Sequence, residues 1–355
     1  MKEKKWSLLV IKIYIGMLLM IGIIVIVIDP FFHYHAPLEF IEYTMASENY
    51  VNDGMTRNFE YQGMITGTST SLGFSEEEAE ELFNKKFIRV SYPGEGFKKI
   101  NDNINVAIEN NSELNFIIRG VDPIWFITDE NWLGYEEYPE YLYDDNLFND
   151  VNYLFNREIL TQNVFPQIFR TSIQEEVIQG ESEEDVSSGT EKQQPEMLKR
   201  YVRPEKIEYV VDEEETKEYF RILEANLKKN VLTVIEENPN IEFYLFFPPY
   251  SICWWDSLYQ SGEAVLKRRI DMEQYVIENV LKYDNVRLFS FYNNYELICN
   301  LNYYGDEVHY SHEVCSKVLN WLKDGKYELT ENNYKEYIAD ITEFYCNYDY
   351  DSIFQ

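Results

Sequence analysis

Apolar residues follow two different periods along this chain, and the two periods alternate. Short apolar runs of strand length occupy five stretches, namely 64–66, 87–90, 115–119, 243–247 and 286–291. Between these runs, apolar residues recur three and four positions apart, which is the spacing of one helix face. Strands that alternate with helices predict βαβ units and a parallel sheet of about five strands. Wholly apolar strands fit a sheet that helices cover on both faces.

Capping residues mark several of the expected helices. Ser75 is placed to cap a helix over 75–84, and Glu78 completes a capping box. Ser311 is placed to cap another helix that closes near Gly325. Further helices are predicted from the apolar spacing over about 97–107, 220–234 and 263–282.

A distinctive turn follows each of the first four predicted strands. These turns are Gly67-Thr68-Ser69, Tyr92-Pro93-Gly94, Gly120-Val121-Asp122 and Pro248-Pro249-Tyr250. The carboxyl ends of parallel strands meet at one edge of a sheet, where ligand sites of such folds lie. We therefore expect the four turns to converge on one rim.

The alternating pattern is interrupted by an acidic insertion at about 123–216. This stretch is rich in Tyr, Asp, Asn and Glu, and residues 174–195 are polar and poor in aromatic residues. We interpret the insertion as a solvated variable loop, which a domain tolerates at little cost in stability. A lid or a partner surface is the alternative.

The N-terminus carries a candidate membrane anchor. Lys2, Lys4 and Lys5 precede a largely apolar run over 7–28, and about 20 helical residues cross a bilayer. The positive-inside rule places tail 1–6 in the cytoplasm and the body outside the cell. A cleaved signal peptide is the alternative, but Asp29-Pro30 follows the run where a small-x-small site is expected. The expected order is then a juxtamembrane segment 29–60, a main domain 61–330 and a C-terminal extension 331–355.

Composition excludes some partners and leaves the cysteines open. A net charge of -32 argues against nucleic acid, because a polyanion would be repelled. The four cysteines either form disulfides outside the cell or are buried free thiols. His33 and His35 have no third metal ligand nearby, so we expect no metal and an interfacial role beside Phe31, Phe32 and Tyr34. Nothing in the sequence points to a cofactor.

The candidate chemistry combines Ser69 with Asp306 and His309. A serine hydroxyl needs a base to become a nucleophile, and an imidazole held by a carboxylate supplies one. Ser71 is an alternative nucleophile and His312 an alternative base. The backbone N–H groups of Ser69 and Gly94 are the expected oxyanion hole. Three further rim residues are possible pocket residues, of which the first two could instead form an ion pair: Arg119, Asp122 and Tyr250.

These motifs resemble the blocks of the SGNH (GDSL-like) hydrolase superfamily. Gly67-Thr68-Ser69 is similar to the first block, Gly94 to the second-block glycine, and Asp306-x-x-His309 to the last block. Asp29-Pro30-Phe31-Phe32-His33-Tyr34-His35 beside an anchor and Phe246-Phe247-Pro248-Pro249-Tyr250-Ser251 extend the resemblance to membrane-anchored Gram-positive members, distantly similar to the DltD and AlgX/AlgJ families. The third block departs, because Gly120-Val121-Asp122 lacks the asparagine that donates to the oxyanion.

The resemblance implies a flavodoxin-like three-layer α/β/α fold and acyl chemistry on extracellular glycans. The expected function is therefore a membrane-anchored extracellular serine esterase or O-acyltransferase. Its expected substrate is a cell-surface polysaccharide or wall polymer. The alternative is an inactive SGNH-fold module that binds glycan or assists a membrane-bound O-acyltransferase. Trp254-Trp255 could serve as a sugar-stacking platform, although packing in the core is the favoured interpretation.

Overall fold

The structure of the protein is a computed structural model that describes residues 2–135, 138–144, 146–169, 196–207 and 212–354. These residues form two compact units. The smaller unit combines residues 1–60 with 136–183, and the larger unit combines residues 61–135 with 184–355. The acidic insertion is thus divided, since its middle part belongs with the N-terminal residues and its ends belong with the sheet.

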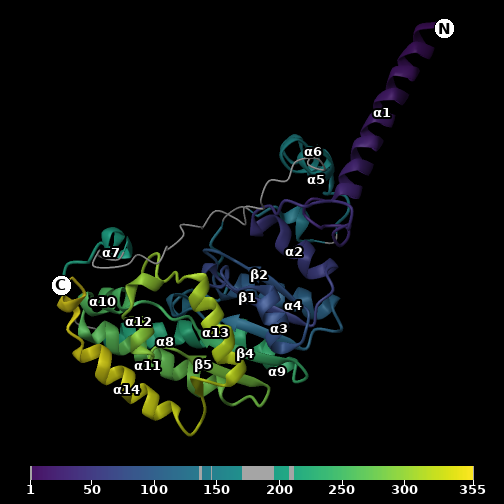
Figure 1. The fold of residues 1–355 in the computed structure, drawn as a ribbon. Helices are drawn as coiled ribbons and strands as arrows, with labels where there is room; N and C mark the ends of the chain where they lie inside the picture. The colour runs from purple at the N-terminus through teal and green to yellow at the C-terminus, as the bar shows by residue number, and fades with distance from the viewer. Residues whose placement is uncertain (1, 136–137, 145, 170–195, 208–211, 355) are drawn as a thin grey trace. The chain divides into compact units, whose positions relative to one another are not determined.

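The larger unit is built on the α/β sheet that the sequence predicts (Figure 1). Its six strands lie in the order β2-β1-β3-β4-β5-β6, and all are parallel except β6, which runs antiparallel to β5. The order of the five parallel strands is that of flavodoxin-like sheets. The strands are β1 Gly63–Gly67, β2 Phe87–Ser91, β3 Phe116–Gly120, β4 Glu242–Phe247, β5 Val286–Ser290 and β6 Glu328–Leu329.

Helices cover both faces of this sheet. On one face, α3 Glu76–Phe83 and α13 His312–Asp324 pack in one cluster with Ile118 of β3. On the other face, Arg119 of β3 reaches α4 Phe97–Asn110 and the π-helix η5 Lys228–Leu232. Successive residues of a strand point to opposite faces of the sheet. Ile118 and Arg119 therefore contact the two different helical layers.

The remaining helices of the larger unit complete the alternation. The Ser75 cap is confirmed, because the Ser75 hydroxyl accepts the Glu78 N–H at 3.1 Å. Ser311 is the N-cap residue of α13, and Gly325 ends that helix at a φ of +70°. The other elements are α7 Glu196–Arg200, α8 Glu213–Leu227, α9 Thr233–Glu237, α10 Ile252–Gln260, α11 Glu263–Val280, α12 Tyr295–Ile298, α14 Tyr334–Asn347, and the 3-10 turns η1 Ser69–Ser71, η2 Pro123–Trp125, η6 Leu301–Tyr303 and η7 Tyr350–Phe354.

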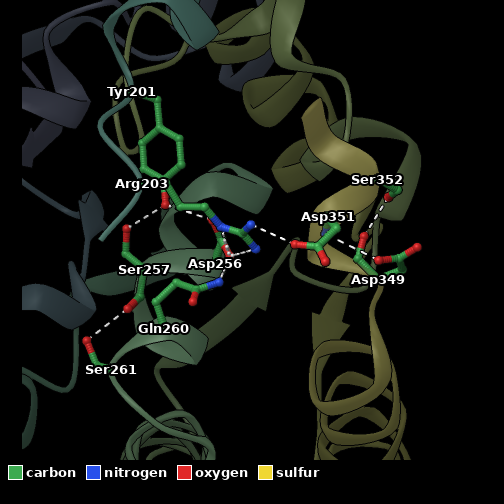
Figure 2. Close-up of polar contacts among 9 residues, drawn as sticks. All are labelled: Tyr201, Arg203, Asp256, Ser257, Gln260, Ser261, Asp349, Asp351 and Ser352. Carbon is green, nitrogen blue, oxygen red and sulfur yellow. Dashed lines mark hydrogen bonds and ion pairs between the residues drawn. The ribbon is translucent and has the colours of Figure 1, made fainter. Parts of the chain in front are cut away.

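A charged clamp holds three segments of the larger unit together. Figure 2 shows Arg203 between Asp256 of α10 and Asp351 of η7. Its guanidinium donates to the fully buried Asp256 carboxylate at 2.9–3.2 Å and to Asp351 at 2.7 Å. Tyr201 and Gln260 also donate to Asp256, so this carboxylate is satisfied on all sides.

Buried aromatic residues form the core beside this clamp. Trp255 is fully buried and stacks on Tyr345 at a centroid distance of 3.7 Å. Trp254 is buried as well, so the Trp pair packs in the core and offers no platform for sugars. All four cysteines are free, and Cys253 and Cys315 are buried.

The smaller unit packs around the C-terminal end of a long apolar helix. Helix α1 Lys2–Ile28 contains a span, Lys5–Ile28, that is long and apolar enough to cross a membrane, with a mean hydropathy of 2.8. The other elements of this unit are α2 Glu48–Asn58, the 3-10 turn η3 Glu140–Leu142, α5 Val151–Leu154, the π-helix η4 Ile159–Val164 and α6 Phe165–Phe169.

The insertion is not a solvated loop over residues 138–169, where it supplies much of this unit's core. Leu142, Tyr153, Ile159 and Val164 are buried in one cluster with Val25 of α1. Burial of these side chains against α1 gives the segment a hydrophobic stabilisation that a loop exposed to water would lack. Residues 174–195, which their polar composition predicts to form a flexible loop, lie outside the described residues.

Asp29 organises the turn that follows α1. Its buried carboxylate accepts backbone N–H groups of His33, Tyr34 and His35 at 2.7–3.0 Å and the Tyr153 hydroxyl at 2.7 Å. Phe31 and Phe32 are also buried, so the expectation that they lie in the membrane interface is wrong: they pack in the core of the unit instead.

Candidate functional site

Three residues from distant parts of the sequence meet at the carboxyl edge of the sheet. Ser69 begins η1, directly after β1, and His309 lies in the loop before α13. The distance from the Ser69 Oγ to the His309 Nε2 is 2.7 Å. The distance from the His309 Nδ1 to the Asp306 Oδ2 is 2.6 Å. Ser69, His309 and Asp306 therefore form a continuous chain of hydrogen bonds.

A tight loop fixes the base relative to its carboxylate. The other Asp306 oxygen accepts the backbone N–H groups of Val308 and His309 at 2.9 and 2.8 Å. The loop is closed by the Gly305 N–H, which donates to the His309 carbonyl at 3.0 Å. The spacing of three residues lets Asp306 accept both the backbone N–H and the ring N–H of His309. The two side chains therefore lie on the same side of the loop.

The electrostatics of the pair set the tautomer of the imidazole. An ionised carboxylate only accepts, so the His309 Nδ1 carries a proton and the Nε2 accepts the Ser69 hydroxyl proton. The hydrogen bond that the His309 Nδ1–H donates to Asp306 raises the pKa of His309, and the charges of Asp306, Asp122 and Glu307 add to the rise. Burial raises the pKa of Asp306, but the hydrogen bonds that His309 and Val308 donate to it lower the pKa by more. The net pKa of Asp306 is therefore lowered.

The four strand-end turns converge as the sequence predicts. The Tyr92 N–H donates to the Gly67 carbonyl at 2.8 Å, which joins the second turn to the first. Asp122 joins the third turn to the first and the fourth, because its carboxylate accepts the hydroxyls of Thr68 and Tyr250. The fourth turn also braces the base loop, because the Ser251 N–H donates to the Glu307 carbonyl at 2.9 Å.

Asp122 lies beneath the serine turn rather than in an open pocket. Its fully buried carboxylate accepts the hydroxyls of Thr68 at 2.9 Å, Thr70 at 3.1 Å and Tyr250 at 2.5 Å. Thr68 and Thr70 flank Ser69, so one carboxylate holds the turn on both sides of the serine. Burial raises the pKa of Asp122, and the three hydroxyl donors oppose this rise.

The expectation that Arg119, Asp122 and Tyr250 line a substrate pocket is not met, because all three are buried. Arg119 points to the opposite face of the sheet and donates to the Asn230 carbonyl at 2.9 Å. It forms no ion pair with Asp122, since the latter is bound by hydroxyl groups alone. Burial without a partner charge lowers the pKa of Arg119 to about 9.

The alternative nucleophile and base are engaged elsewhere. The buried Ser71 hydroxyl donates to the Thr68 carbonyl and contacts the Ser91 hydroxyl, both at 2.7 Å. The His312 Nδ1 lies 2.9 Å from the Gly73 carbonyl oxygen. Neither residue takes part in the chain that joins Ser69 to Asp306.

Gly94 adopts the left-handed conformation that its role as a close-approach residue requires. Its φ is +73°, and a Cβ there would lie 3.3 Å from the Tyr135 hydroxyl oxygen. Within the described part of the chain, the backbone N–H groups of Ser69 and Gly94 form no hydrogen bond to a backbone carbonyl in the turns and loops. Both are thus available to a bound oxyanion.

A loop not singled out from the sequence covers the Gly94 turn. The fully buried Glu95 accepts the backbone N–H groups of Gly134 and Tyr135 at 2.8 and 3.1 Å. Trp132 in the same loop stacks on Trp125 at a centroid distance of 4.8 Å. Tyr135 and Thr70 are the rim residues that sequence reasoning missed; the hydroxyl residues on both sides of Ser69 were the available signal for Thr70.

Comparisons with known proteins add little to this description. No protein-family model matches the chain, and no curated protein matches it. One solved structure, described as a candidate platelet activating factor from Streptococcus pneumonia, is similar at 12% sequence identity and a TM-score of 0.37. The match covers 79% of this chain and 91% of that one. Among the described residues, no cluster of His, Cys, Asp and Glu could hold a metal ion.

Proposed function

We propose that this protein is a membrane-anchored, externally facing SGNH-type serine esterase or O-acyltransferase. The observation that carries the proposal is the chain from Ser69 through His309 to Asp306, with contacts of 2.7 and 2.6 Å. Contacts of this length are those that base activation of a serine requires. The substrate class, an acylated cell-surface polysaccharide or wall polymer, rests on the resemblance of the motifs and on the candidate anchor α1.

The reaction begins when the Ser69 Oγ attacks the acyl carbonyl carbon and the His309 Nε2 takes the hydroxyl proton. Asp306 stabilises the resulting imidazolium through Nδ1. The N–H groups of Ser69 and Gly94 donate to the oxyanion. When the tetrahedral intermediate collapses, the bond to the leaving alkoxide breaks and His309 protonates it, which leaves an acyl-Ser69 ester.

The second half-reaction decides between an esterase and a transferase. A water molecule or a sugar hydroxyl attacks the acyl-Ser69 carbonyl, and His309 again takes the proton from the attacking oxygen. Water yields a free carboxylic acid, whereas a sugar hydroxyl yields a new ester. In both cases the Ser69 hydroxyl is regenerated.

Labelling with a fluorophosphonate probe tests the proposal on the full chain. Wild-type protein and Ser71→Ala should be labelled and should release acetate from p-nitrophenyl acetate or from an O-acetylated polysaccharide. Ser69→Ala should lose labelling, and removal of a triad nucleophile lowers the rate by about 10⁶-fold in a characterised hydrolase. Equal labelling of Ser69→Ala, or turnover equal to wild type, would contradict the proposal.

One observation favours a second function, a glycan-binding module that carries out no turnover. Asp122 stands where the resemblance expects an oxyanion-donating asparagine, and its carboxylate only accepts hydrogen bonds. The site then relies on backbone donors alone. Polysaccharide binding that survives Ser69→Ala and His309→Ala, without label or acetate release in wild type, would support this second function.

A further inference from the structure

A segment of the smaller unit exposes many apolar side chains to solvent. Leu147 is 75% exposed and Phe148 is 91% exposed. Four more apolar residues in the same segment are exposed: Val151, Phe155, Phe165 and Ile168. Six apolar side chains within 22 residues are thus at least partly open to water, an arrangement that marks an interaction surface.

The same segment is also apolar on its covered side. Tyr153, Ile159 and Val164 are buried against α1 and α2. The open side carries the six apolar side chains together with five exposed polar ones, Asn152, Arg157, Glu158, Thr161 and Gln162. This mixture suits the interface of a bilayer better than either water or the bilayer centre. The open side therefore calls for an apolar covering.

The position of this segment along α1 identifies the covering. A Cβ added to Gly22 would lie 3.7 Å from the Phe155 ring. Gly22 precedes the last residue of the helix, Ile28, by six positions, which is about 9 Å along the axis. Ile21, Ile24 and Val25 pack in the same cluster as the segment. Phe155 thus lies at the depth of the candidate membrane span.

Polar contacts above that depth hold the chain on both sides of the stretch 154–166. At the entry, the Tyr153 hydroxyl donates to Asp29 at 2.7 Å, and the Tyr34 hydroxyl donates to Asp150 at 3.0 Å. At the exit, the Gln167 amide exchanges two hydrogen bonds of 3.1 Å with the Thr44 backbone. All of these partners follow the span in sequence. The chain therefore dips beside α1 and returns, and Figure 1 shows α5 and α6 beside the end of that helix.

Resting on the membrane anchoring proposed above, we propose that residues 147–168 contact the outer leaflet of the bilayer that α1 spans, and that the stretch 154–166 between these polar contacts inserts as a re-entrant segment. The apolar side chains contact acyl chains, as in interfacial helices whose apolar face sinks roughly 5–10 Å. Arg157 and Glu158 are exposed between Phe155 and Ile159, and they limit the depth to the interface. The Arg157 stem can extend so that the guanidinium reaches lipid phosphate.

Lipid fits this surface better than a second membrane helix. Helices pack in membranes through small residues. Gly22 is already covered by Phe155, and the exposed side chains of α1 are mainly large and aliphatic, for example Leu9, Ile13 and Leu19. A net charge of -32 repels anionic headgroups, so the apolar contact provides the attachment.

Photocrosslinking of the full chain tests the insertion. Photoreactive benzoylphenylalanine replaces Phe148 or Phe155, two side chains open enough to accept the larger ring. The protein is reconstituted in phosphatidylcholine–phosphatidylglycerol vesicles, irradiated and analysed by mass spectrometry for lipid adducts. Leu19 is the positive control within α1, and Val202, which is 84% exposed in the larger unit, is the control for an open apolar position.

We expect lipid adducts at Phe148 and Phe155 with a yield similar to that at Leu19 and well above that at Val202. The yield should not change between about 0.1 M and about 1 M salt, although the screening length falls from about 10 Å to about 3 Å. Adducts at Leu19 without any at Phe148 and Phe155 would overturn the proposal. So would an adduct to another protein at Phe148 in native membranes, or the absence of lipid adducts at Leu19.

Discussion

Replacing Asp122 by Asn tests whether this buried carboxylate positions the nucleophile. The carboxylate accepts three hydroxyl donors, two of which flank Ser69. Hydrogen bonds to a charged group contribute about 1.5–3 kcal/mol each, against about 0.5–1.5 kcal/mol for neutral ones. An Asn also turns an acceptor into a donor, so at least one hydroxyl must reorient. The restraint on the serine turn should weaken by about 3 kcal/mol in total.

The expected consequence for catalysis is a misplaced Ser69 hydroxyl. A shift of the reacting atom by about 1 Å costs about 100-fold in rate. We therefore expect Asp122→Asn to lower kcat/KM for p-nitrophenyl acetate by about 10- to 100-fold, mainly through kcat. Thr68→Ser keeps the hydroxyl and should stay close to wild type, whereas Thr68→Val removes it and should lose activity.

The pH profile separates positioning from general destabilisation. Activity rises with pH through the pKa of His309, because a protonated imidazole cannot accept the Ser69 proton. The charge of Asp122 contributes to the raised pKa of His309. Asp122→Asn removes that charge, so the acidic limb of the kcat/KM profile should move to lower pH. An unchanged limb, or an unchanged kcat in a variant that folds, would refute the reasoning.

Three further changes have defined outcomes. Asp306→Asn should lower kcat by up to about 10⁴-fold and move the same acidic limb to lower pH, since the main contact that raises the pKa of His309 is lost. Arg203→Met removes the cation from a fully buried carboxylate that Tyr201 and Gln260 still hydrogen-bond, and should lower the free energy of unfolding by about 1–3 kcal/mol. Asp351→Asn at the 78% exposed end of the clamp should cost less than about 1 kcal/mol, and equal effects in urea unfolding would contradict this. Burial raises the pKa of Glu273 to about 8, from an ordinary value of about 4.3. The contribution of the protonated carboxyl to stability is fully present below the ordinary pKa and is lost as the pH rises through 8. Glu273→Gln should therefore show a smaller fall in Tm between pH 5 and 8 than the wild type.

The larger unit could be predicted because its information is local. The strands of the parallel sheet are covered on both faces, so each is short and mainly apolar and stands out from the helices on either side. The turns after these strands are joined in the structure because parallel strands bring their carboxyl ends to one edge. Asp306 and His309 were predictable for the same reason, since a spacing of three residues and one loop place them together.

Arg119 shows where local pattern fails at the rim. It stands one residue before Gly120 at the end of β3, which is where a ligand-binding residue is expected. A strand alternates its side chains, so a shift of one position decides between the two faces. Ile118 packs under α3 and α13, and Arg119 therefore points beneath α4 instead of into the site. Which face of the sheet Arg119 points to depends on the helices that pack on each face. The sequence of one strand does not contain that information.

The acidic insertion fails as a prediction for a different physical reason. Its buried residues Leu142, Tyr153, Ile159 and Val164 are 11, 6 and 5 positions apart, so they follow no regular helical or strand period. They became core because α1 offers an apolar flank to cover, and that flank is more than 100 residues away in sequence. A polar composition predicts a solvated segment only when that segment has no apolar partner elsewhere in the chain. Beside a helix that is apolar on every side, a few apolar residues suffice to bury a segment.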